Sequence, residues 1–313
     1  MTMITRSVLR GLSIVRVRIL FFLQKPKYSK SEAMTGIRRF LNILLVALAK
    51  TVMLSAMKPS GSKLLYVVRH GQALHNPRAE VARAAGCSME EFVEWMRKDD
   101  ALDAELTELG RSQARSVNLP KKDADSIELV VSSPLSRAIE TAELVLPPTT
   151  KIDPAATTEQ RICYEDFREV NGDLLNCKRR ERRELVDRWP HWNFNEISET
   201  DELWTPTMEA FEDAAERGYK GLCWLMERPE KSIFLVAHGG LLKLMMNTHP
   251  HVSLRDGRSN NSNRNGDTNI KPVESRFDNC ELRRYELCWG DNDKNIGDYT
   301  TNGQLPISLV QID

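Results

Sequence analysis

Short apolar runs alternate with longer amphipathic stretches from residue 63 to the end of the chain. Three runs are almost continuously apolar: LLYVV at 64–68, IELVV at 127–131 and SIFLVA at 232–237. Strands that are buried on both faces of a parallel sheet have this pattern, whereas the longer stretches have the spacing of amphipathic helices. This alternation predicts an α/β fold, here a three-layer α/β/α sandwich with a mostly parallel central sheet.

The remaining elements are less sharply defined by the pattern. CELRRYEL at 280–287 and PISLVQI at 306–312 alternate apolar and polar residues, which predicts two strands nearer an edge of the sheet. The stretch 252–272 contains DGRSNNSNRNGD and has almost no apolar residues, so we predict a disordered surface loop there. Helices are predicted at 79–98, 107–118, 134–145, 181–188 and 207–227.

The first 57 residues differ in composition from the rest. They carry ten Lys or Arg and a single acid, and they are rich in Ser and Thr, which is typical of an organelle transit peptide. From Met34, MTGIRRFLNILLVALAK also has the layout of a secretory signal. Its apolar run at 40–49 is shorter than the roughly 20 residues of a membrane span. Organelle or secretory targeting, a membrane anchor, and a start near Met53 or Met57 that would leave the protein cytoplasmic all stay open.

The body of the chain, residues 58–313, is expected to hold one domain. The protein has 44 basic and 44 acidic residues, and because the first 57 are so basic, this body has nine more acids than bases. An acidic body argues against nucleic acid as a partner, and membrane contact is expected only through the N-terminal segment. The six cysteines form neither a CxxC pair nor a zinc-type spacing. The sequence does not indicate an oligomeric state.

Polar and charged residues follow directly after each of the three apolar runs. Arg69-His70-Gly71 follows the first, Ser132-Ser133-Pro134 and then Arg137 follow the second, and His238-Gly239-Gly240 follows the third. Ligands of open α/β sheets bind outside the carboxyl ends of the strands. Two histidines and two arginines are therefore expected to converge at one edge of the sheet.

A phosphate monoester suits this combination of side chains. The guanidinium groups of Arg69 and Arg137 can bind phosphate oxygens through paired, charge-assisted hydrogen bonds. A neutral imidazole can attack phosphorus to form a phosphohistidine, and nearby arginines disfavour a further positive charge on it. Gly71 and Gly239 allow the backbone to approach the oxygens closely. One strand-end histidine or one helical arginine is more simply structural, but their coincidence at three strand ends favours a phosphate site.

Four longer motifs surround these positions. They are RHGQALHN at 69–76, LTELGRSQA at 106–114, SSPLSRAIETA at 132–142 and VAHGGLL at 236–242. In this order they are similar to the RHG signature, the LTxxGxxQA helix, the second arginine motif and the second histidine motif of the histidine phosphatase superfamily. That superfamily is also called the phosphoglycerate mutase-like family, and the resemblance is to its branch with RHG and a later HG. It covers about residues 63–312.

The resemblance implies catalytic roles for four strand-end residues. His70 is the phosphorylated nucleophile, and Arg69, Arg137 and His238 bind the phosphoryl group. Substrate-binding positions are Gln72 and Asn76, by the resemblance, together with the backbone at Gly71 and Gly239. His75 lies near the nucleophile and is a further candidate for contact with the substrate.

A carboxylic acid must protonate the leaving oxygen, because an alkoxide leaves poorly without a proton. The segment FREVNG at 167–172 is similar to the family segment that carries this acid, which nominates Glu169. Glu165, Asp166 and Asp173 lie close enough in the sequence to compete for the role. The basic residues at 177–183 are either a site for a second substrate anion or a solvated helix start.

These features predict a metal-independent phosphatase that hydrolyses phosphate monoesters through phosphohistidine and needs no cofactor. Its substrate would be a phosphorylated small molecule or a phosphoprotein. A phosphoglycerate mutase is the first alternative, although the chain lacks the ERHYG-type stretch and the longer insertion of glycolytic mutases. A catalytically inactive phosphate-binding protein is the second.

Overall fold

The computed structural model describes residues 61–147, 160–256, 276–290 and 305–312. The predicted targeting or anchor segment at 1–57 lies outside the described residues. Within the described part, no helix combines the length and the apolar character needed to cross a bilayer.

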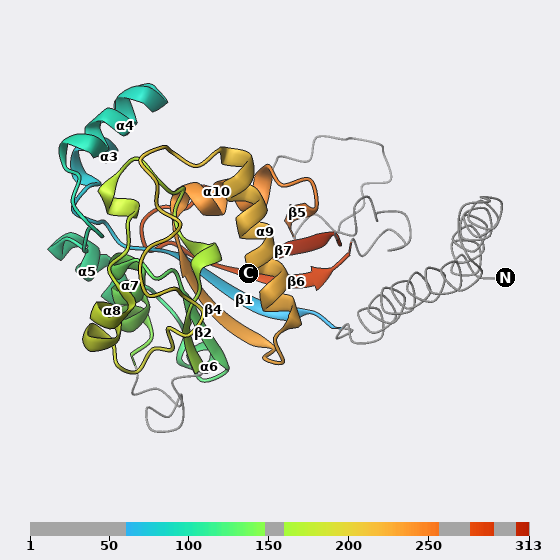
Figure 1. The fold of residues 1–313 in the computed structure, drawn as a ribbon. Coiled ribbons are helices and arrows are strands. Elements are labelled where there is room, and N and C mark those ends of the chain that lie inside the picture. Colours follow the sequence, from blue (N-terminus) through green and yellow to red (C-terminus); the bar gives the residue numbers. More distant parts are fainter. Residues whose placement is uncertain (1–60, 148–159, 257–275, 291–304, 313) are drawn as a thin grey trace, which may run out of the picture. The chain divides into compact units, whose positions relative to one another are not determined.

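A seven-stranded sheet forms the centre of the domain, in the order β3-β2-β4-β1-β6-β7-β5 (Figure 1). Among the described strands, β6 alone runs antiparallel to its neighbours, β1 and β7. The predicted mostly parallel sheet is therefore confirmed. The strands are β1 (Lys63–Arg69), β2 (Leu129–Ser132), β3 (Arg161–Cys163), β4 (Ser232–Ala237), β5 (Val252–Asp256), β6 (Leu282–Trp289) and β7 (Ile307–Ile312).

Helices cover both faces of this sheet. They are α3 (Pro77–Ala84), α4 (Met89–Lys98), α5 (Glu108–Arg115), α6 (Lys121–Ala124), α7 (Ser136–Val145), α8 (Arg182–Arg188), α9 (Phe211–Glu227) and α10 (Gly239–Asn247), with 3-10 turns at Glu165–Phe167 and Leu175–Cys177. Along β1, Leu65 and Val67 face one apolar core with α9 and α10, while Tyr66 and Val68 face a second core with α7 and α8 (Figure 1). The three-layer sandwich is thus confirmed, and each fully buried Leu or Val contributes about 1.5–3 kcal/mol to it.

The predicted helix at 79–98 is in fact two helices, α3 and α4. Gly86, at φ +86°, takes the left-handed conformation that ends α3. Ser88 then begins α4 through a capping box, in which the Ser88 hydroxyl accepts from the amide of Glu91 at 3.2 Å and the Glu91 carboxylate accepts from the amide of Ser88 at 2.9 Å. A helix start in SMEE, two residues after Gly86, outweighs the helical spacing that runs through both segments.

The predicted loop at 252–272 is wrong at its beginning, because residues 252–256 form the edge strand β5, parallel to β7. Val252 and Leu254 alternate with polar residues and pack on the core with α9 and α10, which is enough for a short edge strand. Residues 257–272 lie outside the described part of the chain. The expectation that β6 and β7 lie near an edge holds only loosely: β6 pairs directly with β1, and its alternation reflects one face that is only half-buried.

Candidate active site

Three neighbouring parallel strands bring the predicted residues together. The register pairs Arg69 of β1 with Ala237 of β4 and Ser132 of β2 with Val236 of β4. The first residue after each strand therefore lies at the same edge of the sheet. The backbone continues this pairing by one hydrogen bond, from the amide of His70 to the carbonyl of Ala237 at 3.0 Å. The sheet itself thus places His70, Ser133 and His238 side by side.

His70 is held in one tautomer. Its ring is 2% exposed, and Nδ1 lies 2.7 Å from the carbonyl oxygen of Gly71, which can only accept a hydrogen bond. Nδ1 therefore carries the proton and Nε2 keeps its lone pair. Nε of Arg137 lies 3.4 Å from this Nε2. Burial, together with the charges of Arg137 and Arg69, holds the pKa of His70 well below its usual value, so the ring is neutral at physiological pH.

His238 packs beside the first imidazole. The two ring centroids are 4.9 Å apart, and Nε2 of His238 lies 2.8 Å from the hydroxyl of Ser133. Burial and the charge of Arg137 keep the pKa of His238 well below its usual value as well. Its buried Nδ1 has no hydrogen-bond partner among the described residues, and the same is true of Nδ1 of His75, whose ring centroid is 6.5 Å from that of His70.

The two arginines each leave one buried nitrogen without a protein partner in the described structure: an NH2 group of Arg137 and Nε of Arg69. Other nitrogens of these side chains are held in place, since Arg137 donates to the carbonyl of Asn176 at 2.6 Å and Arg69 donates to the carbonyl of Phe277 at 3.0 Å. Leaving a buried donor unpaired costs about 1–3 kcal/mol, which an anion with several acceptor oxygens would offset. The buried donors around His70 therefore favour a multiply charged oxyanion.

Glu169 lies at the beginning of α10, beside His238. Its carboxylate accepts from the amide of Leu241 at 2.8 Å and from the amide of Gly240 at 3.2 Å. Burial lowers the pKa of Arg69, and the nearby carboxylates of Glu80 and Glu169 oppose that shift. Glu169 is thus close both to Arg69, the predicted phosphate-binding arginine, and to the helix that follows His238.

The other candidate acids are occupied elsewhere or lie away from the strand ends. Glu165 pairs with Arg179 at 2.7 Å. Asp173 forms a two-pronged pair with Arg97, with both distances 2.9 Å. Asp166 is half-buried near Arg217 of α9, and burial raises its pKa.

The arginines at 179–183 are also paired, which argues against the second anion site, one of the two alternatives for this segment. Arg179 is fully buried in contacts with Glu165, Ser198 and Thr200. The remaining arginines of the segment face carboxylates: Arg180 faces Asp103, Glu105 and Glu184, Arg182 faces Glu199, and Arg183 faces Glu181.

The predicted substrate-binding positions lie around the loop that follows β1, but they contact protein groups. The Gln72 side chain donates to Glu80 at 2.9 Å and accepts from Thr107 at 3.0 Å. Asn76 is buried and accepts from the amide of Ala73 at 2.9 Å. In this structure both side chains shape the loop rather than point at His70.

Two of the glycines have a steric reason to be glycine. A Cβ on Gly71 would lie 2.5 Å from the carbonyl oxygen of Gly110, and a Cβ on Gly110 would lie 2.0 Å from that of Gln72. The loop that carries His70 therefore rests directly on the backbone of α5. A Cβ on Gly239 would lie 3.1 Å from Nε of Arg69, so this glycine leaves room for that guanidinium.

Several residues organise the site although the sequence assigned them no role of their own. Ser133 bonds to His238, and Thr141 accepts from the amide of Gly71 at 3.1 Å. Asp103, buried with φ +48°, accepts from the amide of Ser136 at 2.8 Å and so fixes the start of the helix that carries Arg137. Thr141 lies four residues after Arg137 on the same helix face, a spacing that could have suggested it. Asp103 has no such signal.

The fold and the strand-end cluster define an α/β protein with a candidate anion site at the carboxyl ends of parallel strands. The sequence profile described as "Histidine phosphatase superfamily (branch 1)" matches residues 65–286. This chain belongs to the histidine phosphatase superfamily, as its motifs predicted.

Individual relatives agree with this membership. The chain is 31% identical over 281 residues to phosphoglycerate mutase-like protein 1 of Arabidopsis thaliana, which covers 78% of this chain and 88% of the relative. A second Arabidopsis thaliana phosphoglycerate mutase-like protein is 27% identical over 274 residues, with 79% and 93% covered. Among solved structures, the ecdysone phosphate phosphatase from Bombix mori matches with a TM-score of 0.41 and 14% identity, covering 71% of this chain and 88% of the other.

Proposed function

We propose that this protein is a phosphatase that hydrolyses phosphate monoesters through a covalent phosphohistidine at His70. The observation that carries the proposal is the orientation of this ring. The carbonyl of Gly71 fixes the proton on Nδ1, and Nε2 lies beside Nε of Arg137, where phosphate oxygens would bind. A neutral nucleophile next to a buried cation is what attack on a phosphate dianion requires.

In the first step, the Nε2 lone pair of His70 attacks phosphorus, the N–P bond forms and the ester P–O bond breaks. The leaving oxygen takes a proton from the carboxyl group of Glu169. In the second step, that carboxylate accepts a proton from water, and the water oxygen attacks phosphorus as the N–P bond breaks. Inorganic phosphate leaves, and both His70 and Glu169 return to their starting protonation states.

The arginines supply the charge compensation in both steps. Arg69 and Arg137 face the transferring phosphoryl group, and His238 offers it a further buried nitrogen. Positioning and electrostatic stabilisation of the phosphoryl oxygens account for most of the catalysis of phosphoryl transfer. Two fixed guanidinium groups perform here what a metal ion does in other phosphatases, so the proposed reaction uses neither a metal nor an organic cofactor.

The test is phosphate release by the full-length protein from a panel of phosphate esters in the presence of a chelator. The panel includes sugar phosphates, a phosphopeptide and 3-phosphoglycerate. His70→Ala should lower kcat/KM by at least about 10⁴-fold, as expected when a nucleophile is lost. His191→Ala is the matched control, because it removes an imidazole that bonds to Glu143 instead. A His70→Ala enzyme within a few-fold of wild type would disprove the assignment.

A phosphoglycerate mutase is the second candidate, favoured by the names of the Arabidopsis thaliana relatives. It differs from the phosphatase in shielding the phosphohistidine from water. Conversion of 3-phosphoglycerate to its 2-isomer, without release of phosphate, would decide for the mutase. Binding of phosphate without either reaction would leave a phosphate-binding protein.

A further inference from the structure

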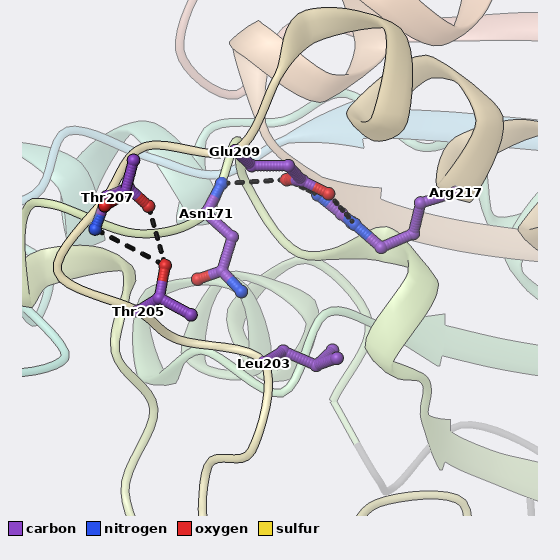
Figure 2. Close-up of a pocket in the computed structure, with 6 residues that line it drawn as sticks. All are labelled: Asn171, Leu203, Thr205, Thr207, Glu209 and Arg217. Atoms are coloured by element: carbon purple, nitrogen blue, oxygen red, sulfur yellow. Dashed lines mark hydrogen bonds and ion pairs between the residues drawn. The ribbon is translucent and has the colours of Figure 1, made fainter.

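One side chain of α9, Arg217, contacts the backbone of the segment that carries Glu169 at several points. Its two NH groups donate to three backbone carbonyls, those of Asp166 and Arg168 at 2.9 Å each and that of Glu169 at 3.0 Å. Its remaining donors bond to Glu209 at 2.9 and 2.7 Å. All five N–H donors of the guanidinium are therefore used. Figure 2 shows the two side chains facing each other beside Asn171.

Glu209 extends this hold to the other side of Glu169. Its carboxylate accepts from the amide of Asn171 at 3.0 Å, and its own amide donates to the carbonyl of Asn171 at 2.8 Å (Figure 2). Gly172, at φ +82°, allows the chain to turn here, and a Cβ on it would lie 2.1 Å from the carbonyl oxygen of Thr207. The acid segment is thus bound before, at and after Glu169.

The pair is largely shielded from solvent, with the side chains of Arg217 and Glu209 10% and 18% exposed. Burial alone would raise the pKa of Glu209, but the hydrogen bonds and charge of Arg217 outweigh it and lower that pKa. The pair is therefore ionised at neutral pH. A planar, two-pronged pair of this kind fixes direction as well as distance, which a lysine cannot reproduce.

We infer that Arg217 and Glu209 are positioning residues that fix the carboxyl group of Glu169 at the reach needed to protonate the leaving oxygen. The inference rests on the proposed function. It goes beyond a role in stability, because the groups held are the backbone carbonyl of Glu169 itself and its neighbours on both sides. A shift of this backbone moves the carboxyl group away from the ester oxygen, while the contacts of His70 and Arg137 stay as they are.

A misplaced acid has a kinetic signature that simple destabilisation lacks. An ester whose leaving group is a poor base, such as 2,4-dinitrophenyl phosphate, needs no proton in the first step. An alkyl phosphate does need one. The ratio of kcat/KM between the two esters therefore reports the position of the acid, since kcat/KM contains phosphoryl transfer to His70 and not the later hydrolysis.

The decisive variant is Arg217→Lys in the full-length protein, which keeps the positive charge and removes the planar fork. We expect kcat/KM for ethyl phosphate to fall by about 10²-fold, which is the lower end of the range for loss of a general acid. We expect kcat/KM for 2,4-dinitrophenyl phosphate to stay within about threefold of the wild-type value. Arg161→Lys is the matched control. Arg161 is even more deeply buried than Arg217, with its side chain 3% exposed, and it donates to Glu143 at 3.2 Å and to the carbonyl of Leu146 at 2.8 Å, away from Glu169.

Glu169→Gln distinguishes a failure of the positioning role from a failure of the proposed acid. Suppose that Glu169→Gln lowers kcat/KM for ethyl phosphate selectively while Arg217→Lys lowers kcat/KM for both esters equally or for neither. In that case the positioning role is disproved while the proposed function stands. If Glu169→Gln shows no selective loss, the assignment of the acid itself fails. Should Arg217→Lys not fold, Glu209→Gln keeps the side-chain shape and removes the charge from the pair. A selective loss in that variant supports the inference, and an equal loss on both esters overturns it.

Discussion

Two clusters of buried arginines lie in this domain, and they are built in opposite ways. In the paired cluster, Arg168 bonds to both carboxylate oxygens of Asp201 at 2.6 and 2.7 Å, and Arg179 bonds to Glu165 at 2.7 Å. In the strand-end cluster, Arg137 is as deeply buried but forms no direct ion pair with any described carboxylate. Its Nε lies 3.4 Å from the neutral ring of His70, and the buried carboxylate of Asp103 interacts with it only through its charge.

The difference shows which arginines are structural. A buried cation that has its counter-charge within the fold contributes to the stability of the loops that it joins. A buried cation without one costs free energy until an anion arrives, and such groups concentrate at functional sites. For arginines as deeply buried as Arg168, Arg179 and Arg137, a directly bonded carboxylate therefore indicates a structural role and the lack of one indicates a ligand site. Arg69 does not follow this rule, because it is partly exposed and lies 3.6 Å from Glu80.

Breaking the paired cluster should give the largest loss of stability. Arg168→Met leaves the carboxylate of Asp201 buried without its partner, since the two side chains are 1% and 2% exposed. We expect the free energy of unfolding to fall by about 3–5 kcal/mol, as for other buried pairs that lose one member. Urea unfolding followed by tryptophan fluorescence measures this. A loss below about 1 kcal/mol would show that the cluster is not structural.

The same change in the strand-end cluster should act on catalysis instead. Arg137→Met removes a donor from the phosphoryl group, so kcat/KM should fall by about 10²–10³-fold, as when one donor to a developing oxyanion is deleted. Its midpoint of urea unfolding should stay close to that of the wild type. If Arg137→Met were as destabilised as Arg168→Met, the contrast between the two clusters would fail.

Inorganic phosphate should stabilise the wild-type protein by supplying the absent counter-charge. At 100 times its dissociation constant, it should raise the free energy of unfolding by about 2.7 kcal/mol. Thermal unfolding with phosphate or with an equal ionic strength of chloride measures the effect. Arg168→Met should retain this gain and Arg137→Met should lose most of it. An equal gain in both variants would place the bound phosphate elsewhere.

The smallest effect concerns pH. Burial and the charge of Arg137 keep the pKa of His70 well below 6.5, so its ring should show almost no titration between pH 7.5 and 6. The folded protein then binds fewer protons than the unfolded one below about pH 6.5, and stability should fall as the pH drops through that range. Imidazole ¹⁵N spectra report the tautomer directly. A titration midpoint at or above 6.5 would show that the cations do not keep the ring neutral.

The sequence predicted the strand-end cluster because each member follows directly after a strand with an unmistakable apolar pattern. His70 and His238 are one residue beyond β1 and β4, and Arg137 is the second residue of α7, five residues beyond the end of β2. Parallel pairing then brings the three together without any detail of side-chain packing. Glu169 was nominated by its motif, and its carboxylate lies at the amides that begin α10.

The supporting contacts could not be predicted in the same way. Arg217 lies 48 residues from the carbonyl of Glu169 to which it donates, and Asp103 lies 33 residues from the amide of Ser136. Such contacts depend on how loops fold back over the sheet, and a helical arginine or a loop aspartate has the same local pattern whether or not it has a buried partner. The edge strand β5 was missed for a related reason, because only two apolar residues mark it.

The backbone contact between Gly71 and Gly110 has a consequence for reading large sets of variants. A Cβ on Gly71 would meet the backbone oxygen of Gly110, and a Cβ on Gly110 would meet that of Gln72, so no smaller side chain at the other position can relieve either clash. In a library that randomises both sites, we expect only the double-glycine pair to survive selection for activity. Two positions 39 residues apart would then look individually intolerant and show no covariation, although they are in direct contact.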